Sequence, residues 1–403
     1  MPLRTIDDLG DLAGRRVFVR ADLNVPSRDG VVTDDSRVRA TLPTLTELIE
    51  RGASLVVASH LGRPKGKVAE EARMRPLAEM LAEFLGLVVE YVPTDGVLNA
   101  EVERSCEALA IEPGRVVLLE NLRFDPGEEA DDRAFALRLA DLADAYVDDA
   151  FGAVHRAHAS VSALPEIMLA QGRPAVAGRL LEREVAALSR LLGEPARPYV
   201  AVLGGAKVSD KLATISSLVE RVDALLIGGA MAFTFLAADG AEVGNSLVEP
   251  DRFEDVRAAR GRADERGVVI RLPEDVIAAP EVAGEAPRHT VPAGEVPRGE
   301  MGLDIGPRAV EQFARTIAEA RTILWNGPMG VFELEPFSAG TRGVATAIAG
   351  AKAFSVAGGG DSLAAIKKYG LTDGFDHLST GGGASLEFLE GRSLPGIEIL
   401  EVG

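Results

Sequence analysis

The amino-acid sequence predicts an α/β fold with two doubly wound parallel-sheet domains joined by a hinge helix. Three observations support this prediction. Short runs rich in Val, Leu, Ile and Ala alternate with helical patterns, which indicates strands buried on both faces of parallel sheets. The polar residues that follow these runs differ in kind between the two halves of the chain. An amphipathic stretch separates the halves, and 403 residues are enough for two domains.

The expected strands fall into two sets of four. In the first half they are RRVFVR (15–20), ASLVVASH (53–60), RVVLLE (115–120) and AYVDDA (145–150). In the second half they are PYVAVL (198–203), ALLIGG (224–229), TILWNG (322–327) and AFSVAGGG (353–360). Rossmann-like sheets of this kind bind ligands beyond the carboxyl ends of their strands, so the residues that follow each run are the first site candidates.

The stretch between the two sets predicts a single helix. Its apolar residues recur at spacings of four, three and four, and so form one stripe: Leu181, Val185, Leu188 and Leu192. A helix that joins two domains fits a hinge, although a core helix inside one large domain would show the same pattern. The predicted boundaries are 1–175 for the N-terminal domain, 176–193 for the interdomain helix, 194–388 for the C-terminal domain and 389–403 for a final segment.

Composition argues against several classes of protein. The formal net charge of -19 argues against a nucleic-acid or anionic-membrane partner, because both need a basic surface. Cys106 is the single cysteine and cannot form an internal disulfide, which favours a reducing compartment. The first residues carry acids where a secretory signal would be apolar, and no uncharged run is long enough to span a bilayer. We therefore expect a cytoplasmic protein.

The strand ends of the first half carry side chains suited to a small anion. They are Arg20, Asp22, Asn24, His60, Arg63, Asn121, Arg123, His155, Arg156 and His158. Arginine pairs with carboxylate and phosphate in a planar, bidentate way, so a substrate with both groups would use several of them. Taken one at a time, these motifs are also explained by ordinary structure, as a capped turn and a histidine whose hydrogen bonds are satisfied. A metal site at His155 and His158 lacks a third ligand at a useful spacing.

Glycine clusters take the equivalent positions in the second half. They are Gly204–Gly205, Gly228–Gly229, Gly327, Gly358–Gly360 and Gly381–Gly383. Free backbone N–H groups at helix N-termini hold phosphates, and glycine lets a phosphate approach. Lys207 and Lys211 of LGGAKVSDK are expected in the first turn of a helix, where they oppose the macrodipole unless a polyanion binds. The alternative is a tight turn with two solvated lysines.

Two familiar nucleotide motifs do not match these turns. The P-loop pattern is absent from LGGAKVSDK, and a dinucleotide fingerprint that starts at Gly358 meets Leu363 where its third glycine should be. In GGGDS, Asp361 and Ser362 are equally well explained as ordinary N-cap residues. A Rossmann-type dehydrogenase and a two-domain solute-binding protein remain as alternatives, although the first should show that glycine and the second an export signal.

Ten motifs occur in order from residue 20 to residue 387: RADLNVP, DDSR, SHLGRP, LLENLRF, HRAHAS, LGGAKVSDK, GLDIGP, WNGPMGVFE, GGGDS and STGGGASLE. Together they resemble the phosphoglycerate kinase family along essentially the whole chain. The resemblance implies a phosphotransferase of glycolysis and gluconeogenesis with a carboxyl group as acceptor. Its reaction would be reversible transfer from 1,3-bisphosphoglycerate to ADP, giving ATP and 3-phosphoglycerate. The resemblance also implies in-line transfer on domain closure, Mg²⁺ as cofactor and a monomeric state.

The resemblance carries the family's roles to matching positions of this sequence. The N-terminal domain would hold phosphoglycerate through Asp22, Leu23, Asn24, Arg37, His60, Leu61, Gly62, Arg63, Arg123 and Arg156. The C-terminal domain would hold the nucleotide through Lys207, Lys211, Gly302, Asn326, Pro328, Glu333, Gly359, Gly360, Asp361 and Ser362. Catalytic roles would fall to Arg37, Lys207 and Gly360, and the metal to Asp361.

Two further expectations follow from the resemblance. The segment 389–403 would return to the N-terminal domain. Ala230 stands where the family usually has a glycine, and we expect it to narrow the nucleotide cleft slightly without abolishing activity.

Overall fold

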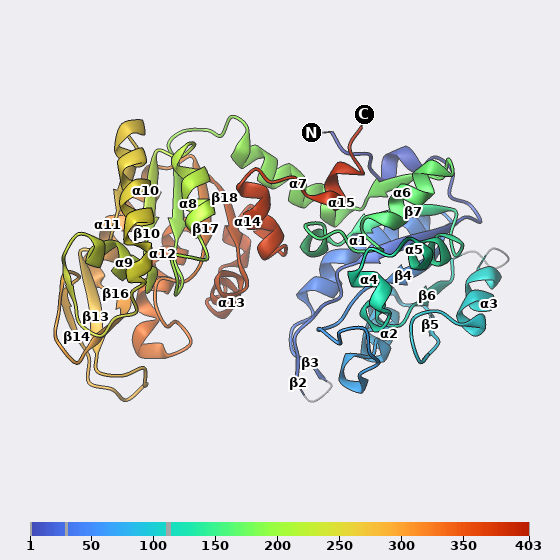
Figure 1. Ribbon diagram of the computed structural model, residues 1–403, viewed down its shortest axis with the longest axis horizontal. Helices are drawn as coiled ribbons and strands as arrows, with labels where there is room; N and C mark the ends of the chain where they lie inside the picture. Colours follow the sequence, from blue (N-terminus) through green and yellow to red (C-terminus); the bar gives the residue numbers. More distant parts are fainter. Residues whose placement is uncertain (1, 29–30, 110–113, 403) are drawn as a thin grey trace. The chain divides into compact units, whose positions relative to one another are not determined.

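The computed structural model describes residues 2–28, 31–109 and 114–402. The chain forms two compact units, one from Met1–Ala186 with Ser393–Gly403 and the other from Ala187–Arg392. Each unit contains a six-stranded parallel sheet with helices packed against it (Figure 1), which confirms the predicted α/β fold. The boundary between the units falls within α7 (Arg179–Leu192), the helix that carries the predicted apolar stripe.

The sheet of the first unit has the order β5-β6-β4-β1-β7-β8. Its strands are β1 (Arg16–Ala21), β4 (Ser54–Ala58), β5 (Val89–Tyr91), β6 (Val116–Leu118), β7 (Ala145–Asp149) and β8 (Ala175–Ala177). Two short strands, β2 (Ser27–Arg28) and β3 (Val31–Val32), pair antiparallel outside it. The central position of β1 explains its continuous apolar sequence, because it is buried between β4 and β7.

Helices cover both faces of this sheet. They are α1 (Ser36–Glu50), α2 (Arg75–Leu85), α3 (Ala100–Ala108), α4 (Pro126–Glu129), α5 (Arg133–Ala140), α6 (Ala163–Ala170), the start of α7 and α15 (Pro395–Glu398), with 3-10 turns η1 (Ile6–Leu9), η2 (Glu70–Ala72), η3 (Leu122–Phe124) and η4 (Phe151–Ala153). Val17 of β1 shares a core cluster with Leu45 of α1 and Leu77 of α2. Phe18 points to the opposite face and stacks on Tyr146 of β7.

Backbone hydrogen bonds hold the C-terminal residues beside the start of the chain. The N–H of Arg4 donates to the carbonyl of Leu400 at 2.9 Å, and the N–H of Gly396 donates to the carbonyl of Val154 at 3.0 Å. Residues from the two ends of the chain therefore belong to the same unit.

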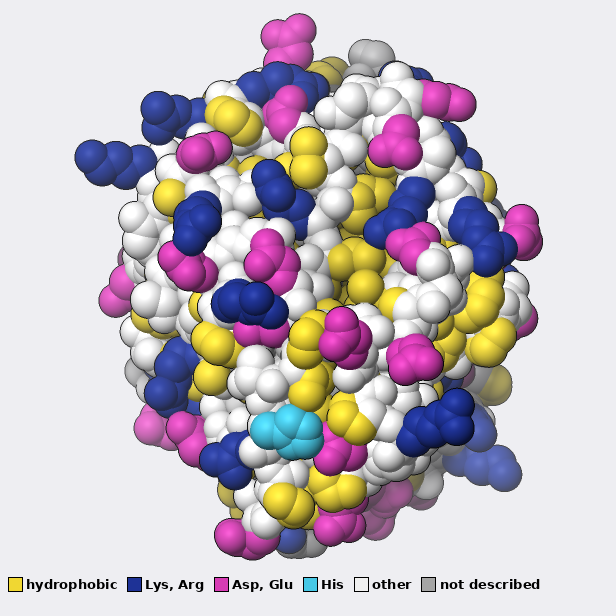
Figure 2. Space-filling view, turned by 90° about the vertical axis from the view of Figure 1, so that its left-hand side faces the viewer, with side chains coloured by type: hydrophobic (Ala, Val, Ile, Leu, Met, Phe, Trp, Pro, Cys, Tyr) yellow, Lys and Arg dark blue, Asp and Glu magenta, His cyan; other side chains and the backbone are white. Residues whose placement is uncertain are grey.

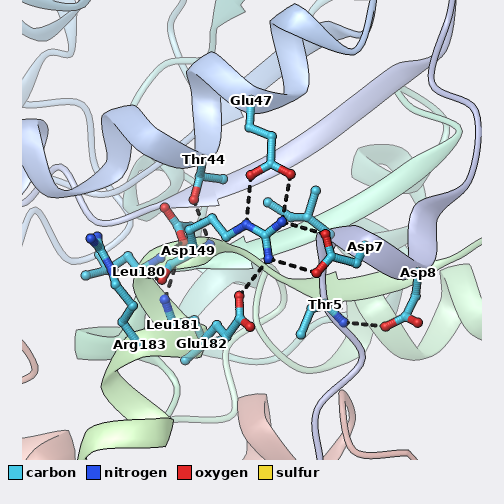
Figure 3. Close-up of polar contacts among 12 residues, drawn as sticks. Thr5, Asp7, Asp8, Thr44, Glu47, Asp149, Leu180, Leu181, Glu182 and Arg183 are labelled. Atoms are coloured by element: carbon cyan, nitrogen blue, oxygen red, sulfur yellow. Dashed lines mark hydrogen bonds and ion pairs between the residues drawn. The ribbon is translucent and has the colours of Figure 1, made fainter.

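Asp149, at the end of β7, caps the first turn of α7 (Figure 3). Its carboxylate accepts hydrogen bonds from the N–H of Leu180 at 2.8 Å and from the hydroxyl of Thr41, on α1, at 2.7 Å. Burial raises the pKa of Asp149 to about 6, although these hydrogen bonds oppose the shift. The sheet, α1 and the start of α7 thus meet at one buried carboxylate.

Arg179 adds an ion-pair cluster at the same end of α7, and Figure 3 labels its three carboxylate partners, Asp7, Glu47 and Glu182. Its guanidinium pairs with Glu47 at 2.7 Å, Asp7 at 2.6 Å and Glu182 at 2.9 Å, and its backbone N–H donates to the Thr44 hydroxyl at 2.8 Å. Three carboxylates around one guanidinium form a network rather than an isolated surface pair, so they fix α7 more firmly to α1 and the N-terminal residues.

The sheet of the second unit has the order β12-β10-β9-β17-β18-β19. Its strands are β9 (Tyr199–Leu203), β10 (Ala224–Ile227), β12 (Val269–Arg271), β17 (Thr322–Asn326), β18 (Phe354–Gly358) and β19 (His377–Ser379). A smaller antiparallel sheet contains β13 (Asp275–Ala279), β14 (His289–Pro292) and β16 (Met301–Ile305), and β11 (Glu242–Val243) pairs with β15 (Glu295–Val296). The sequence patterns did not predict the strands of these two smaller sheets.

Helices surround the parallel sheet of the second unit as well. They are α8 (Leu212–Val219), α9 (Met231–Ala238), α10 (Phe253–Arg266), α11 (Pro307–Glu319), α12 (Ala339–Ala349), α13 (Gly360–Lys368) and α14 (Gly383–Leu389), with 3-10 turns η5 (Pro250–Arg252), η6 (Glu335–Phe337) and η7 (Thr372–Gly374). Trp325 of β17 packs in one core cluster with Phe313 of α11 and Ile366 of α13. Ala201 and Leu225 point the other way and are fully buried too, so both faces are covered.

The surface of the second unit mixes charges of both signs. Figure 2 shows one side of this unit, where acidic and basic side chains alternate and hydrophobic side chains lie among them. Within the described ranges 2–28, 31–109 and 114–402, no helix is long and apolar enough to cross a membrane.

Candidate active site

The predicted anion site of the first unit lies at the carboxyl ends of β1 and β4. Asp22 follows β1 and is buried, and Arg37, in the first turn of α1, donates from Nη1 to both of its carboxylate oxygens at 2.9 Å. The side-chain oxygen of Asn24 accepts from the N–H of Gly62 at 2.9 Å, which ties the loops after β1 and β4 together. The aspartate therefore sets the direction of the Arg37 side chain.

Arg123 and two histidines complete this cluster. Arg123 follows β6, and its Nη1 donates to the carbonyl of Gly62 at 2.8 Å. Burial lowers the pKa of His60 well below its ordinary value, and the nearby guanidinium groups of Arg20 and Arg123 lower it further. Burial and the same arginines lower the pKa of His158 to about 4. The positive charge of the cluster at neutral pH therefore comes from arginine, not from these histidines.

The remaining predicted residues of this half differ in exposure. Arg63 and Arg156 are exposed, and Arg156 is close enough to lower the pKa of Arg123. Among the described residues, no hydrogen bond or ion pair joins Arg63 to the cluster. Leu23 and Leu61 direct their side chains into the core, and they contribute backbone groups: the N–H of Leu23 donates to Ser59, and the carbonyl of Leu61 accepts from Asn121.

In the second unit, the glycine turns after β9, β10 and β17 pack backbone against backbone. The N–H of Gly204 donates to the carbonyl of Asn326 at 3.0 Å, and that of Gly205 to Pro328 at 3.0 Å. The N–H of Gly229 donates to Met329 at 3.1 Å. A Cβ atom on Gly204 would overlap the carbonyl oxygen of Pro328. Only glycine permits this approach, which explains the clusters that the sequence shows.

Lys211 lies against these turns and is partly buried. Its Nζ donates to the carbonyl of Asn326 at 3.0 Å and also to that residue's side-chain oxygen. Burial lowers the pKa of Lys211 to about 8, against the attraction of Asp210 and Asp361. Lys211 is therefore an ammonium group whose proton is weakly held near neutral pH.

The expected position of the two lysines on a helix was wrong. The helix α8 begins at Leu212, so Lys207 and Lys211 precede it. The intervening turn finds its hydrogen-bond partner outside the helix: Ser209 donates from its N–H at 3.0 Å and from its hydroxyl at 2.6 Å to the carboxylate of Glu249. Sequence reasoning missed Glu249, because it lies 40 residues further along the chain and belongs to no local motif.

The glycine-rich turn after β18 leads into α13. Gly359 is the N-cap residue, with φ +91°, and α13 starts at Gly360. Asp361 is exposed in the first turn. The hydroxyl of Ser362 accepts a hydrogen bond from the N–H of Gly327 at 2.6 Å. Ser362 thus joins two glycine turns, and this leaves Asp361 as the accessible polar side chain of the motif.

A pocket of about 370 Å³ opens beside these turns, entirely within the second unit. Its lining combines apolar side chains, among them Phe233, Val276 and Leu303, with the glycine turns. Four predicted nucleotide residues line it: Gly302, Pro328, Glu333 and Asp361. An apolar slot next to these turns and to Asp361, in the first turn of α13, suits a flat ring attached to phosphates.

Ala230 lines the same pocket. Its backbone has φ -66° and ψ -26°, an ordinary right-handed helical conformation in which any side chain is unstrained. The methyl group therefore occupies space in the pocket without distorting the turn.

Comparisons with known proteins agree with one another. A model of the family described as "Phosphoglycerate kinase" matches residues 6–392. The phosphoglycerate kinase of Salinispora tropica is 54% identical over 410 residues, covering 100% of both chains. That of a strain of Thermus thermophilus is 53% identical over 400 residues, covering 99% of this chain and 100% of its own.

Solved structures show the same likeness. The structure of phosphoglycerate kinase from Coxiella burnetii has a TM-score of 0.87 and 42% identity, with 99% of each chain covered. That from Pyrococcus horikoshii has a TM-score of 0.84 and 35% identity, with 99% of this chain and 98% of the other covered.

Proposed function

Because the chain belongs to the phosphoglycerate kinase family, a family of kinases, we propose that it transfers a phosphoryl group reversibly between 1,3-bisphosphoglycerate and ADP, giving 3-phosphoglycerate and ATP. The pocket of the second unit carries this proposal, since it combines an apolar slot with glycine turns and a carboxylate. The arginine cluster of the first unit supplies the complementary charges for a carboxylate and a phosphate.

The side chains fit a magnesium ion that arrives with the nucleotide. Among the described residues, no group of three or more His, Cys, Asp or Glu side chains could hold a metal by itself. Mg²⁺ is usually bound through one or two carboxylates together with substrate phosphates. Asp361, exposed at the start of α13 and lining the pocket, would provide that carboxylate. When bound, the ion would neutralise phosphate charge.

The residues of the chain contribute alignment and positive charge. Phosphoryl transfer needs little covalent help from protein, but it needs charge around the oxygens of the transferred group. In the proposed mechanism Arg37, held by Asp22, and Lys207 both reach that group when the enzyme closes on its substrates. Two unit charges 4 Å apart attract by about 4 kcal/mol at an effective dielectric constant of 20, but by only about 1 kcal/mol in water. Exclusion of water therefore strengthens catalysis and limits hydrolysis of the acyl phosphate.

The proposal is tested by assaying the purified protein for ATP formation from ADP, Mg²⁺ and 1,3-bisphosphoglycerate. ATP should form only when all three are present. Folded protein that forms no ATP would contradict the proposal, and NAD-dependent turnover would instead support a dehydrogenase. Tight binding of a small solute without turnover would support a solute-binding protein.

Arg156→Ala is expected to weaken 3-phosphoglycerate binding about 10-fold to 100-fold, with little change in turnover at saturation, because it removes one charged hydrogen bond to a substrate group. Steady-state kinetics would measure both parameters. Arg138→Ala is the matched control, since Arg138 is an exposed arginine of the same unit outside the cluster. A variant with an unchanged KM would exclude Arg156 from the binding site.

ADP affinity is expected to fall as the pH rises from 7 to 9.5. The pKa of Lys211 is lowered to about 8, so the free enzyme loses this charge over that range. Bound phosphate favours the charged form, and binding near pH 8.5 should therefore take up a proton. Calorimetry in buffers of different ionisation enthalpy would measure the uptake. Lys211→Arg, which keeps its charge, should remove the pH dependence. If the ADP affinity of the unaltered protein does not change with pH and no proton is taken up, Lys211 does not bind the nucleotide phosphates.

A further inference from the structure

His60 is held by a buried contact with Arg20 that the roles above do not use. The Nη2 of Arg20, on β1, lies 3.0 Å from the Nδ1 of His60, and both side chains are almost fully buried. A guanidinium group has only hydrogen-bond donors, so Nδ1 must carry a lone pair and accept. The ring of His60 is therefore neutral, and its one N–H is on Nε2.

Arg20 is itself fixed on two sides. Its Nη1 donates to the carbonyl of Ala21 at 2.6 Å, and its Nε donates to the hydroxyl of Ser160 at 2.8 Å. With Nη2 directed at His60, every nitrogen of the guanidinium has a partner. The orientation that Arg20 presents to the histidine ring therefore depends on where Ser160 lies.

Ser160 is in turn oriented by Glu128, a fully buried carboxylate on α4. The Ser160 hydroxyl donates to Glu128 Oε1 at 2.7 Å, and its backbone N–H donates to Oε2 at 3.0 Å. A hydroxyl has one hydrogen, so the Ser160 oxygen accepts from Arg20 while it donates to Glu128. The hydroxyl of Tyr146 donates to the Ser160 carbonyl at 2.8 Å and fixes the backbone.

The charges of this chain of contacts are balanced inside the protein. Burial raises the pKa of Glu128, but the positive charge of Arg20 and the hydrogen bonds from Ser160 favour its ionised form. The carboxylate offsets the guanidinium, and a neutral His60 avoids adding a third charge beside Arg37 and Arg123.

We infer that Arg20, Ser160 and Glu128 are positioning residues that hold His60 as the neutral Nε2–H tautomer, so that the glycerate site contains a fixed, uncharged hydrogen-bond donor. The choice of 3-phosphoglycerate as the ligand rests on the proposed function. The tautomer follows from the contacts alone. The inference therefore has one readout in the free protein and one that requires the ligand.

The first experiment is nitrogen NMR of the histidine rings in the free protein, with the His60 signals assigned by their loss in His60→Gln. The chain has 5 histidines, so the spectrum is simple. We expect the two His60 nitrogens to differ strongly, with the proton on Nε2, and to show no titration near pH 6.5. A proton on Nδ1, or titration near neutral pH, would overturn the inference whatever the enzyme's substrate is.

The second experiment compares Ser160→Ala and Glu128→Gln with the control Ser162→Ala, a buried serine of the same segment. Ser160→Ala should mix the His60 tautomers and weaken 3-phosphoglycerate binding about tenfold, the effect of one impaired hydrogen bond to a charged group, with little change in turnover at saturation. Glu128→Gln keeps the shape of the side chain, so it should shift the His60 nitrogen signals in the same direction as Ser160→Ala but by less. Unchanged His60 signals in Ser160→Ala would show that Ser160 and Glu128 do not position His60.

The two readouts separate failure of the inference from failure of the proposed function. Suppose that the His60 tautomers mix in Ser160→Ala as expected, but the unaltered protein does not bind 3-phosphoglycerate. The proposed ligand would then be rejected, while the inferred tautomer of His60 would stand. If Ser160→Ala does not fold, Glu128→Gln and the unaltered protein still decide, because the proton position is read directly in both.

Discussion

Lys207→Ala is expected to lower turnover by about 10²-fold to 10³-fold, while the dissociation constant of ADP rises far less. Lys207 is exposed and, in the part of the chain that the structure describes, makes no hydrogen bond or ion pair. Its turn is nevertheless held in place, because Ser209 is fixed by Glu249. A free ammonium group on a fixed turn suits charge that develops only in the transition state.

Steady-state kinetics would give the turnover of this variant, and calorimetry would give its affinity for ADP. Lys352→Ala is the matched control, because Lys352 is also an exposed lysine of the second unit and lies away from the pocket. Unchanged turnover for Lys207→Ala would remove this lysine from the transition state. An equal loss of ADP affinity and turnover would make it a binding residue instead.

The strands of the sheet centres were predictable because each is a continuous apolar run. All eight expected runs coincide with strands of the two parallel sheets, from β1 to β18. Several strands that were not predicted are only three residues long, and β5 and β12 are partly exposed edge strands. β6 is equally short but was predicted, because its apolar run continues into Leu119, whereas β5 (VEY) and β12 (VIR) each contain a charged residue that breaks the apolar run. Of the antiparallel strands, β14 is mostly exposed and β16 has an aspartate among its apolar residues. β13 does have a short apolar run, VIAA, which was not assigned to a strand from the sequence.

The clustering of the candidate site residues was predictable where they directly follow a strand. The reason is geometric, since parallel strands end at one edge of the sheet and bring those residues together. Asp22 and Gly62 follow different strands, yet both lie in the cluster that Arg37 and Asn24 complete. Partners that come from helices and long loops leave no such signal, because only the tertiary fold decides which of them approach the site.

Glu249 and Glu128 are examples of such partners. Glu249 reaches back 40 residues to Ser209, and Glu128 reaches forward 32 residues to Ser160. In the sequence each is one acid among 62, with nothing to distinguish it from a solvated surface residue. Burial distinguishes Glu128, and paired hydrogen bonds distinguish both. Glu249 also holds the lysine turn ahead of α8, because it accepts from both the N–H and the hydroxyl of Ser209.

Gly229→Ala is expected to destabilise the protein by about 2–4 kcal/mol and to weaken ADP binding strongly. Gly229 has φ +65°, a conformation that costs an L-residue about 1–2 kcal/mol. Its added Cβ would lie 2.5 Å from the backbone nitrogen and 2.6 Å from the carbonyl oxygen of Gly205. These are backbone atoms of a neighbouring glycine turn, so they cannot move away as a flexible side chain would, and the remaining cost comes from overpacking.

The expected loss of affinity follows from the same geometry. Gly205 and Gly229 both line the pocket, and the carbonyl of Pro328 lies 2.9 Å from the position of the added atom. The substitution must therefore spread the turns that line the proposed nucleotide pocket. Urea unfolding would measure the stability, and calorimetry would measure the dissociation constant of ADP. Both should change in this variant even though no side chain that contacts the ligand has been removed.

Gly261→Ala separates this effect from a general effect of losing a glycine. Gly261 lies in the middle of α10, is exposed, and has nothing within 4 Å of its added Cβ. Its replacement should stabilise the helix by about 0.8–1 kcal/mol and leave ADP binding unchanged. If Gly229→Ala behaved like this control, the three turns would have room for a side chain. Their close packing would then not be what shapes the phosphate end of the pocket.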